Sequence, residues 1–160
     1  IMNIYLIRHG EAEKASLQKK DFDRKLTQEG EQKIKTAAEG WKLLIPNFSH
    51  IISSPLIRAI QTAEIVAAVY KFHGKVLIDK RLSPGSKTQF IVDICYEIMG
   101  SDMAFVGHEP DFSEHVSNLI SSASANVDFK KGMIAKIGFD GKVRLGKGVL
   151  EFLIPAKAYK

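Results

Sequence analysis

The feature of this sequence that most constrains its fold is a short apolar run, Ile4 to Ile7, that ends abruptly in Arg8-His9-Gly10. Such a run is typical of a strand buried on both faces, as in a parallel sheet covered by helices. In open α/β sheets, ligands bind beyond the carboxyl ends of the strands, which is where this change in polarity falls. We therefore expect Arg8 and His9 to hold an anion, with Gly10 allowing a sharp turn or a close approach of the backbone.

Strand and helix signals then alternate along the chain, which favours an α/β architecture. Helical repeats of apolar residues follow Thr27 and Ser54-Pro55, a third repeat ends near Met99, and a fourth helix starts at Pro110. We expect the Thr27 side chain to cap the first helix and Ser54 to cap the second, with Pro55 at its first position. The apolar runs between the helices predict three further strands: His50–Ser53, Val76–Ile78 and Met103–Val106.

The C-terminal segment has a different pattern. The stretches Ile134–Phe139 and Lys142–Ile154 flank Asp140-Gly141, a dipeptide typical of tight hairpin turns. We expect antiparallel strands here, added to the parallel ones. The sequence thus predicts a single domain over residues 1–160, a three-layer α/β/α sandwich with a mixed, mainly parallel sheet.

The composition narrows the class of protein. A hydrophobic content of 45% and a charged content of 26% over 160 residues fit an ordinary globular protein. No run approaches the ~18 apolar residues that a membrane helix needs, and Cys95, the one cysteine, leaves no internal disulfide, so we expect a cytoplasmic protein. The net charge of +5 favours acidic partners weakly, and because the lysines are dispersed we expect no nucleic-acid partner.

Three basic fragments occupy the same kind of position in this pattern. Arg8 and His9 follow the first strand, Arg58 lies about one turn into the helix after the second, and His108 follows the fourth. The carboxyl ends of parallel strands meet at one edge of a sheet, so we expect these side chains to lie together. Two arginines and two histidines would repel one another unless an anion lay between them. A phosphoryl group fits, since guanidinium groups match its oxygens and depress the pKa of a neighbouring histidine, keeping it neutral and nucleophilic.

The fragments also carry a family resemblance. Arg8-His9-Gly10, the stretch from Ser54 to Ala63 and Gly107-His108-Glu109-Pro110 resemble, in order, the motifs of the histidine phosphatase (phosphoglycerate-mutase-like) superfamily. The stretch Asp23-Arg24-Lys25-Leu26-Thr27 and the short chain further resemble its SixA-like phosphohistidine phosphatase branch.

This resemblance implies a mechanism and a set of site residues. His9 would attack phosphorus and form a phosphohistidine intermediate, which water then hydrolyses. Arg8 and Arg58 would hold the equatorial oxygens, and His108 would bond the phosphoryl group and stabilise the transferred charge. The resemblance implies no metal and no cofactor.

The expected substrate follows from a carboxylic acid that is missing. Relatives that act on alkyl phosphates usually carry an acid in the loop after the third strand, whereas the stretch Arg81–Gly85 contains no Asp or Glu. An alkoxide leaving group needs a proton, but an imidazole does not. The missing acid therefore points to a P–N bond, and the resemblance to the SixA-like branch implies that the substrate is a phosphohistidine on another protein.

Two alternatives stay open. If Glu11, Glu13 or Glu109 supplied the acid, the protein would be a general phosphomonoester phosphatase of the same superfamily. A module that binds phosphoproteins without turning them over is the second alternative, although such a module needs no nucleophile. The oligomeric state does not follow from the sequence, and a monomer is compatible with it.

Overall fold

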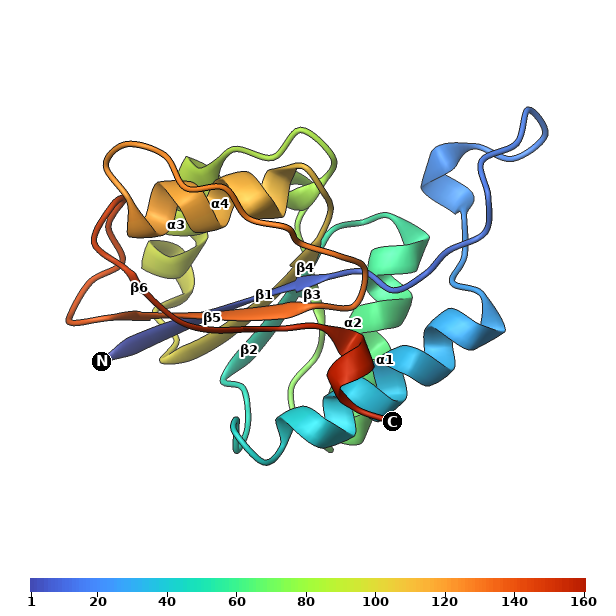
Figure 1. The fold of residues 1–160 in the computed structure, drawn as a ribbon, viewed down its shortest axis with the longest axis horizontal. Helices are drawn as coiled ribbons and strands as arrows, with labels where there is room; N and C mark the ends of the chain where they lie inside the picture. Colours follow the sequence, from blue (N-terminus) through green and yellow to red (C-terminus); the bar gives the residue numbers. More distant parts are fainter.

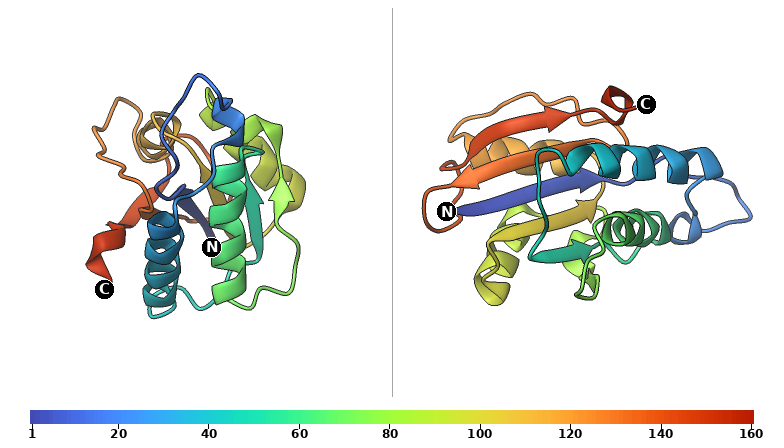
Figure 2. Two further views of the ribbon diagram at one scale, coloured as in Figure 1. Left: turned by 90° about the vertical axis from the view of Figure 1, so that its right-hand side faces the viewer. Right: turned by 90° about the horizontal axis from the view of Figure 1, so that it is seen from below.

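The computed structural model covers residues 1–160 and contains one six-stranded sheet with helices on both faces (Figures 1 and 2). Across the sheet the strand order is β3-β2-β4-β1-β5-β6. The pairs β3–β2, β2–β4 and β4–β1 are parallel, whereas β1–β5 and β5–β6 are antiparallel, which confirms a mixed, mainly parallel sheet. The strands are β1 (Met2–Arg8), β2 (His50–Ser53), β3 (Leu77–Ile78), β4 (Asp102–Gly107), β5 (Ile134–Phe139) and β6 (Val149–Ile154).

Four α-helices and three short 3₁₀-helices connect and cover these strands. The α-helices are α1 (Gln28–Trp41), α2 (Ile57–Val69), α3 (Thr88–Ile98) and α4 (Asp111–Ile120), and the 3₁₀-helices are η1 (Asp21–Asp23), η2 (Lys80–Leu82) and η3 (Ala156–Ala158). Helices α1 and α2 pack on one face of the sheet, while α3 and α4 pack on the other. None of the helices combines the length and the apolar composition needed to cross a membrane.

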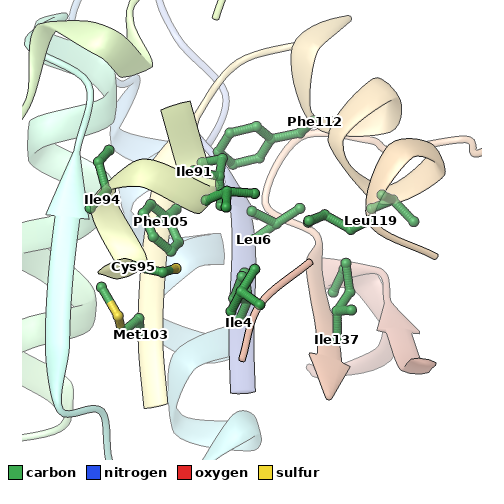
Figure 3. Packing of buried hydrophobic residues seen from close by; sticks show 14 of the residues in the cluster. Ile4, Leu6, Ile91, Ile94, Cys95, Met103, Phe105, Phe112, Leu119 and Ile137 are labelled. Carbon is green, nitrogen blue, oxygen red and sulfur yellow. The ribbon is translucent and has the colours of Figure 1, made fainter. Parts of the chain in front are cut away.

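Strand β1 explains why the sheet is covered on both sides. Successive side chains of a strand point to opposite faces, so Tyr5 and Ile7 join the core against α1 and α2, whereas Ile4 and Leu6 join the core against α3 and α4. Figure 3 shows Ile4 and Leu6 among the side chains of the second core. Cys95 lies in that core and is buried.

The start of α1 follows the sequence prediction and ties the helix to the chain after β1. The Thr27 hydroxyl oxygen accepts the N–H of Gly30 at 2.9 Å, so Thr27 caps the helix. The Thr27 N–H in turn donates to the carbonyl oxygen of Glu11 at 3.0 Å. Gly30 packs so closely that a Cβ there would lie 2.2 Å from the same Glu11 oxygen. The first turn of α1 therefore lies directly against the residues that follow Arg8-His9-Gly10.

The predicted cap of α2 is wrong. The helix begins at Ile57 after Leu56, whose extended backbone (φ −66°, ψ 137°) prevents an earlier start. The Ser54 hydroxyl oxygen instead accepts the Leu56 N–H at 3.2 Å and holds the turn before the helix. Arg58 is consequently the second residue of α2 and does not lie about one turn into the helix, as the sequence predicted.

The tight hairpin expected at Asp140-Gly141 is also wrong, although β5 and β6 are antiparallel as predicted. Residues 140–148 form a longer connection that packs against the end of α4. Its Val143 side chain is buried, and the N–H groups of Gly146 and Gly148 donate to α4 carbonyl oxygens, each at 2.8 Å. These contacts keep residues 142–148 out of strand β6.

Candidate active site

The carboxyl ends of β1, β2 and β4 lie next to one another and place three side chains at one edge of the sheet. The His9 N–H donates to the Gly107 carbonyl oxygen at 3.1 Å, and the Ser54 N–H donates to the Val106 carbonyl oxygen at 3.0 Å. The residue after β1 and the residue after β2 are thus both held by β4. His9, Ser54 and His108 lie together here, and Arg58 reaches them from the first turn of α2.

The His9 ring is held with one nitrogen free to react. Its Nδ1 lies 2.7 Å from the Gly10 carbonyl oxygen, and because a carbonyl only accepts, Nδ1 carries the proton. The lone pair is therefore on Nε2, where it accepts Arg58 Nε–H at 3.3 Å. Burial lowers the pKa of His9 to about 3, and the charges of His108, Arg58 and Arg8 lower it further against the opposing effect of the Gly10 bond. His9 is a neutral imidazole at physiological pH.

His108 faces His9 across the site, with their ring centroids 5.2 Å apart and their planes tilted by 53°. Its Nε2 lies 2.7 Å from the Ser54 hydroxyl oxygen, whereas its buried Nδ1 has no hydrogen-bond partner in the protein. Burial lowers the pKa of His108 to about 4, with further lowering by Arg58 and Arg8. Ser54 therefore lies at the site. The sequence predicted it only as a helix cap and did not indicate this contact with His108.

The two arginines are held by different parts of the chain. Arg8 Nη1 donates to the Phe129 carbonyl oxygen at 2.9 Å, and its buried Nε has no partner in the protein. Arg58 is only 6% exposed, and its Nη1 donates to the Asp21 carbonyl oxygen at 2.8 Å. Each guanidinium is thereby oriented by a backbone oxygen from a distant loop while other N–H groups stay available to a ligand.

Thr62 links the chain after β1 to the first turn of α2. Its hydroxyl oxygen accepts the Gly10 N–H at 3.1 Å, and its hydroxyl donates to the Arg58 carbonyl oxygen at 2.8 Å. Thr62 is fully buried. Because residues i and i+4 of a helix share a face, the four-residue spacing from Arg58 is a sequence signal that could have identified Thr62 as a neighbour of the site.

Asp21 is the functional neighbour that the sequence did not reveal. It lies in the loop between β1 and α1, which projects beyond the end of β1 (blue in Figure 1), and its Oδ2 is 3.2 Å from Arg58 Nη2. Arg24 fixes this carboxylate through Oδ1 at 2.8 Å and itself donates to the Glu13 carbonyl oxygen at 2.7 Å. The bond from Arg24, and then the charge of Arg58, hold the pKa of Asp21 below its usual range.

The three glutamates considered as proton donors are directed elsewhere. Glu13 pairs with Lys19 at 2.6 Å and accepts the Lys25 N–H at 3.0 Å. Glu109 accepts the N–H of Ser113 at 2.7 Å and also its hydroxyl, within the start of α4. Glu11 is exposed, with its nearest cation, Lys33, at 3.9 Å. None of the three makes a hydrogen bond or ion pair with the groups at the site.

The stretch Gly85-Ser86, in the loop after β3, is held by a carboxylate of α4. Asp111 is buried, and one of its oxygens accepts the N–H groups of Gly85 and Ser86 at 2.9 and 3.2 Å. Burial raises the pKa of Asp111, while these two bonds oppose the rise. Asp111 thus fixes where the loop lies.

Taken together, two guanidinium groups and the His108 imidazole lie around the His9 ring, whose Nε2 carries the lone pair. Positive charge and N–H donors on several sides suit a tetrahedral oxyanion. The unprotonated Nε2 adds a nucleophile that a simple anion-binding site does not need.

Known proteins show which family this chain resembles. The family model described as the histidine phosphatase superfamily (branch 1) matches residues 4–83, half of the chain. An uncharacterized protein of Picosynechococcus sp. (strain ATCC 27264) is 35% identical over 116 residues, which cover 71% of this chain and 70% of that protein.

Solved structures share the whole fold at lower identity. The protein histidine phosphatase SixA complexed with tungstate superposes with a TM-score of 0.86 at 20% identity, covering 98% of this chain and 99% of its own. A protein of Agrobacterium tumefaciens assigned as a SixA phosphohistidine phosphatase gives a TM-score of 0.81 at 18% identity and covers 96% and 97%. A phosphoserine phosphatase mutant of Entamoeba histolytica in complex with phosphoserine gives 0.75 at 19% identity and covers 98% of both chains.

The matched residues 4–83 include Arg8, His9 and Arg58, and the structure adds His108, the residue after β4, beside them. The motif order, the fold and the family match agree, and the chain belongs to branch 1 of the histidine phosphatase superfamily.

Proposed function

We propose that this phosphatase hydrolyses phosphohistidine on a protein substrate, by way of a phosphorylated His9. The observation that carries the proposal is the state of the His9 ring. Its Nδ1–H is held by the Gly10 carbonyl oxygen, and its Nε2 lone pair lies among Arg8, Arg58 and His108.

In the first step His9 Nε2 attacks phosphorus, and the bond from phosphorus to the substrate imidazole breaks. The substrate imidazole leaves as a neutral ring when its other nitrogen carries a proton. Arg8 and Arg58 bind the equatorial oxygens, and His108 bonds the same group as charge moves between the two nitrogens. Binding to several fixed donors also places the phosphoryl group in line for the attack.

In the second step water attacks phosphorus and the bond to His9 breaks, releasing inorganic phosphate. The Gly10 carbonyl oxygen matters here because it keeps the proton on Nδ1 of His9. Phosphorylated His9 therefore leaves phosphorus as a neutral imidazole and needs no additional acid. One tautomer of His9 serves both steps.

The choice of phosphohistidine rests on the carboxyl groups around the site. Glu11, Glu13 and Glu109 bond other partners or solvent. Asp21 reaches Arg58, but its lowered pKa leaves it ionised at neutral pH, when it has no proton to give. A leaving alkoxide has a pKa near that of water, roughly 16, and needs such a proton, whereas imidazole, with a pKa of about 6.5, leaves without one. The likeness in fold to SixA proteins supports the same substrate class.

The experiment compares phosphate release, with EDTA present, from a phosphohistidine peptide and from a phosphoserine peptide of otherwise identical sequence. We expect release from the phosphohistidine peptide to be at least a hundredfold faster (about 10²-fold, the low end for loss of general acid assistance). His9→Ala serves as the blank. Quenching during turnover should trap an acid-labile, alkali-stable phosphoryl group on the wild type and none on the variant.

Each alternative has its own outcome. Equal rates on both peptides would keep the phosphatase and reject the phosphohistidine substrate, and Asp111→Asn would then test the buried carboxyl beside the loop after β3 as the donor. Binding of the phosphopeptide without His9-dependent release would favour the non-catalytic module.

A further inference from the structure

A groove lined by lysines lies between α1, the loop before β5 and the C-terminal segment. Its volume is about 430 Å³, and no carboxylate side chain lines it. Figure 1 shows the C-terminal segment (red) lying against α1 and close to the end of the loop before β5 (orange). The basic side chains of this lysine groove are Lys33, Lys130, Lys131, Lys157 and Lys160.

The lysine groove adjoins the candidate active site through the backbone. The Phe129 carbonyl oxygen accepts Arg8 Nη1–H at 2.9 Å, and the Gly132 N–H donates to the carbonyl oxygens of Arg8 and His9 at 3.1 and 3.2 Å. Lys130 and Lys131 lie between these two anchors. The backbone that carries both lysines is therefore bonded on either side to Arg8 and His9.

The lysine groove gathers five of the 23 basic residues of a chain whose net charge is +5. Lys33 pairs with Glu29 at 2.8 Å and Lys130 with Asp128 at 3.2 Å. The other three groove lysines form no ion pair within the protein, and their charge faces solvent.

The kind of cation indicates the kind of partner. No arginine lines the groove, although arginine is the residue that binds phosphates and base edges in two-point fashion. Lysine is a hydrated point charge, suited to carboxylates at a wet interface and to steering a partner toward its site. A groove with lysines and no arginine thus favours an acidic protein surface over a nucleic acid.

We propose that the lysine groove docks an acidic surface of the protein whose phosphohistidine enters the site. The inference rests on the proposed function, because it takes the phosphorylated side chain to be seated at His9. Docking at the groove orients that protein and increases its local concentration at the site.

The test uses two phosphohistidine peptides of equal length, one with glutamates on both sides of the phosphohistidine and one with glutamines. At low ionic strength the wild type should show a kcat/KM about tenfold higher for the acidic peptide. The preference should disappear at high salt, where exposed charges are screened.

Charge reversal then locates the effect. In K131E/K157E the ratio between the two peptides should fall to about one or below, and K131Q/K157Q should give an intermediate ratio. The matched control is K75E/K147E, which makes the same change in net charge at exposed positions just before β3 and β6 that do not line the groove. It should keep the wild-type ratio.

Three results would overturn the inference. A ratio that is equal in K131E/K157E and K75E/K147E would leave only a general charge effect. A DNA duplex that competes with the glutamine peptide in the wild type but not in K131E/K157E, when the acidic peptide shows no preference, would assign the groove to nucleic acid. If neither peptide loses phosphate in a His9-dependent way, the proposed function itself fails, and the docking with it.

Discussion

The Asp21 carboxylate lies 3.2 Å from the Arg58 guanidinium, although 37 residues separate the two in the chain. The Asp21 carbonyl oxygen accepts a second N–H of the same guanidinium at 2.8 Å. Arg58 is also the residue proposed to hold the phosphoryl group. The loop between β1 and α1 therefore places a carboxylate beside the guanidinium that is proposed to bind the phosphoryl group.

Replacing Asp21 should strengthen product inhibition. Asp21→Asn removes the charge and keeps the size, so inorganic phosphate should inhibit about fivefold more strongly, for a repulsion on the order of 1 kcal/mol in a partly solvated site. The measurement is the inhibition constant of phosphate. Asp23→Asn is the control, because Asp23 lies in the same 3₁₀-helix and makes no bond with Arg58. Unchanged or weaker inhibition in Asp21→Asn would contradict the competition.

Removal of the Ser54 hydroxyl should lower activity. Ser54→Ala takes away the partner of His108 Nε2 at 2.7 Å and lets the ring turn. We expect kcat/KM to fall about tenfold, as for one lost hydrogen bond of roughly 1–1.5 kcal/mol. Ser53→Ala provides the comparison, since Ser53 is equally buried but donates only to the Ser54 carbonyl oxygen. Equal losses of activity in the two variants would show that burial, and not the contact with His108, is responsible.

Thr62 should affect turnover more than binding. Thr62→Val keeps the shape but leaves the Gly10 N–H without its acceptor. A buried unsatisfied donor costs about 1–3 kcal/mol of unfolding free energy, and the displaced His9 should lower kcat more than it raises KM.

Thr88→Val is the control that separates a loss of stability from a loss of kcat. Thr88 is also buried, and its hydroxyl lies 2.8 Å from His115 Nδ1 in α4. This variant should lose stability with little change in kcat. If it lost kcat as strongly as Thr62→Val, loss of stability alone would explain both.

Acid should destabilise the fold through its buried histidines. Burial lowers the pKa of His9 to about 3 and those of His108 and His115 to about 4. The unfolded chain takes up these protons near pH 6.5, so it binds more protons than the folded state below that pH. Stability should therefore fall as the pH drops from about 6.5 toward 4, by about 1.4 kcal/mol per pH unit for each histidine.

Urea unfolding at pH 7.5 and pH 5.0 measures this effect above the range in which carboxylates titrate. The free energy of unfolding should be several kcal/mol lower at pH 5.0 (about 2 kcal/mol per fully shifted histidine over that range). His115→Gln should reduce the difference by about a third, because it removes one of three equivalent groups. An unfolding free energy that is the same at both pH values would show that these rings take up protons as readily in the folded protein as in the unfolded chain.

Local signals in the sequence predicted those parts of the fold that depend on neighbouring residues. The apolar run His50–Ser53 is a strand with those bounds, and Thr27 caps α1 because its hydroxyl needs only the N–H of Gly30 three residues later. The parallel order of the strands placed His9 and His108 at one edge.

Predictions failed where a distant contact decides the local structure. Serine is a residue typical of helix caps, but the Ser54 hydroxyl contacts His108, which lies 54 residues further along the chain. The dipeptide Asp140-Gly141 is typical of a tight turn, but the burial of Val143 against the core favours a longer connection between β5 and β6. Asp21 carries no local signal, since only the folded loop brings it to Arg58.

The close packing of Gly30 against the Glu11 carbonyl oxygen has a consequence for protein engineering. Replacing a helical glycine with alanine ordinarily stabilises a protein, by about 0.4–1 kcal/mol. At position 30 the added methyl group would meet backbone 2.2 Å away and push the chain that leads back to His9. A thermostabilisation programme that selects helix positions by propensity would here produce a folded protein with a misaligned nucleophile, so α1 has to be redesigned together with the loop it supports.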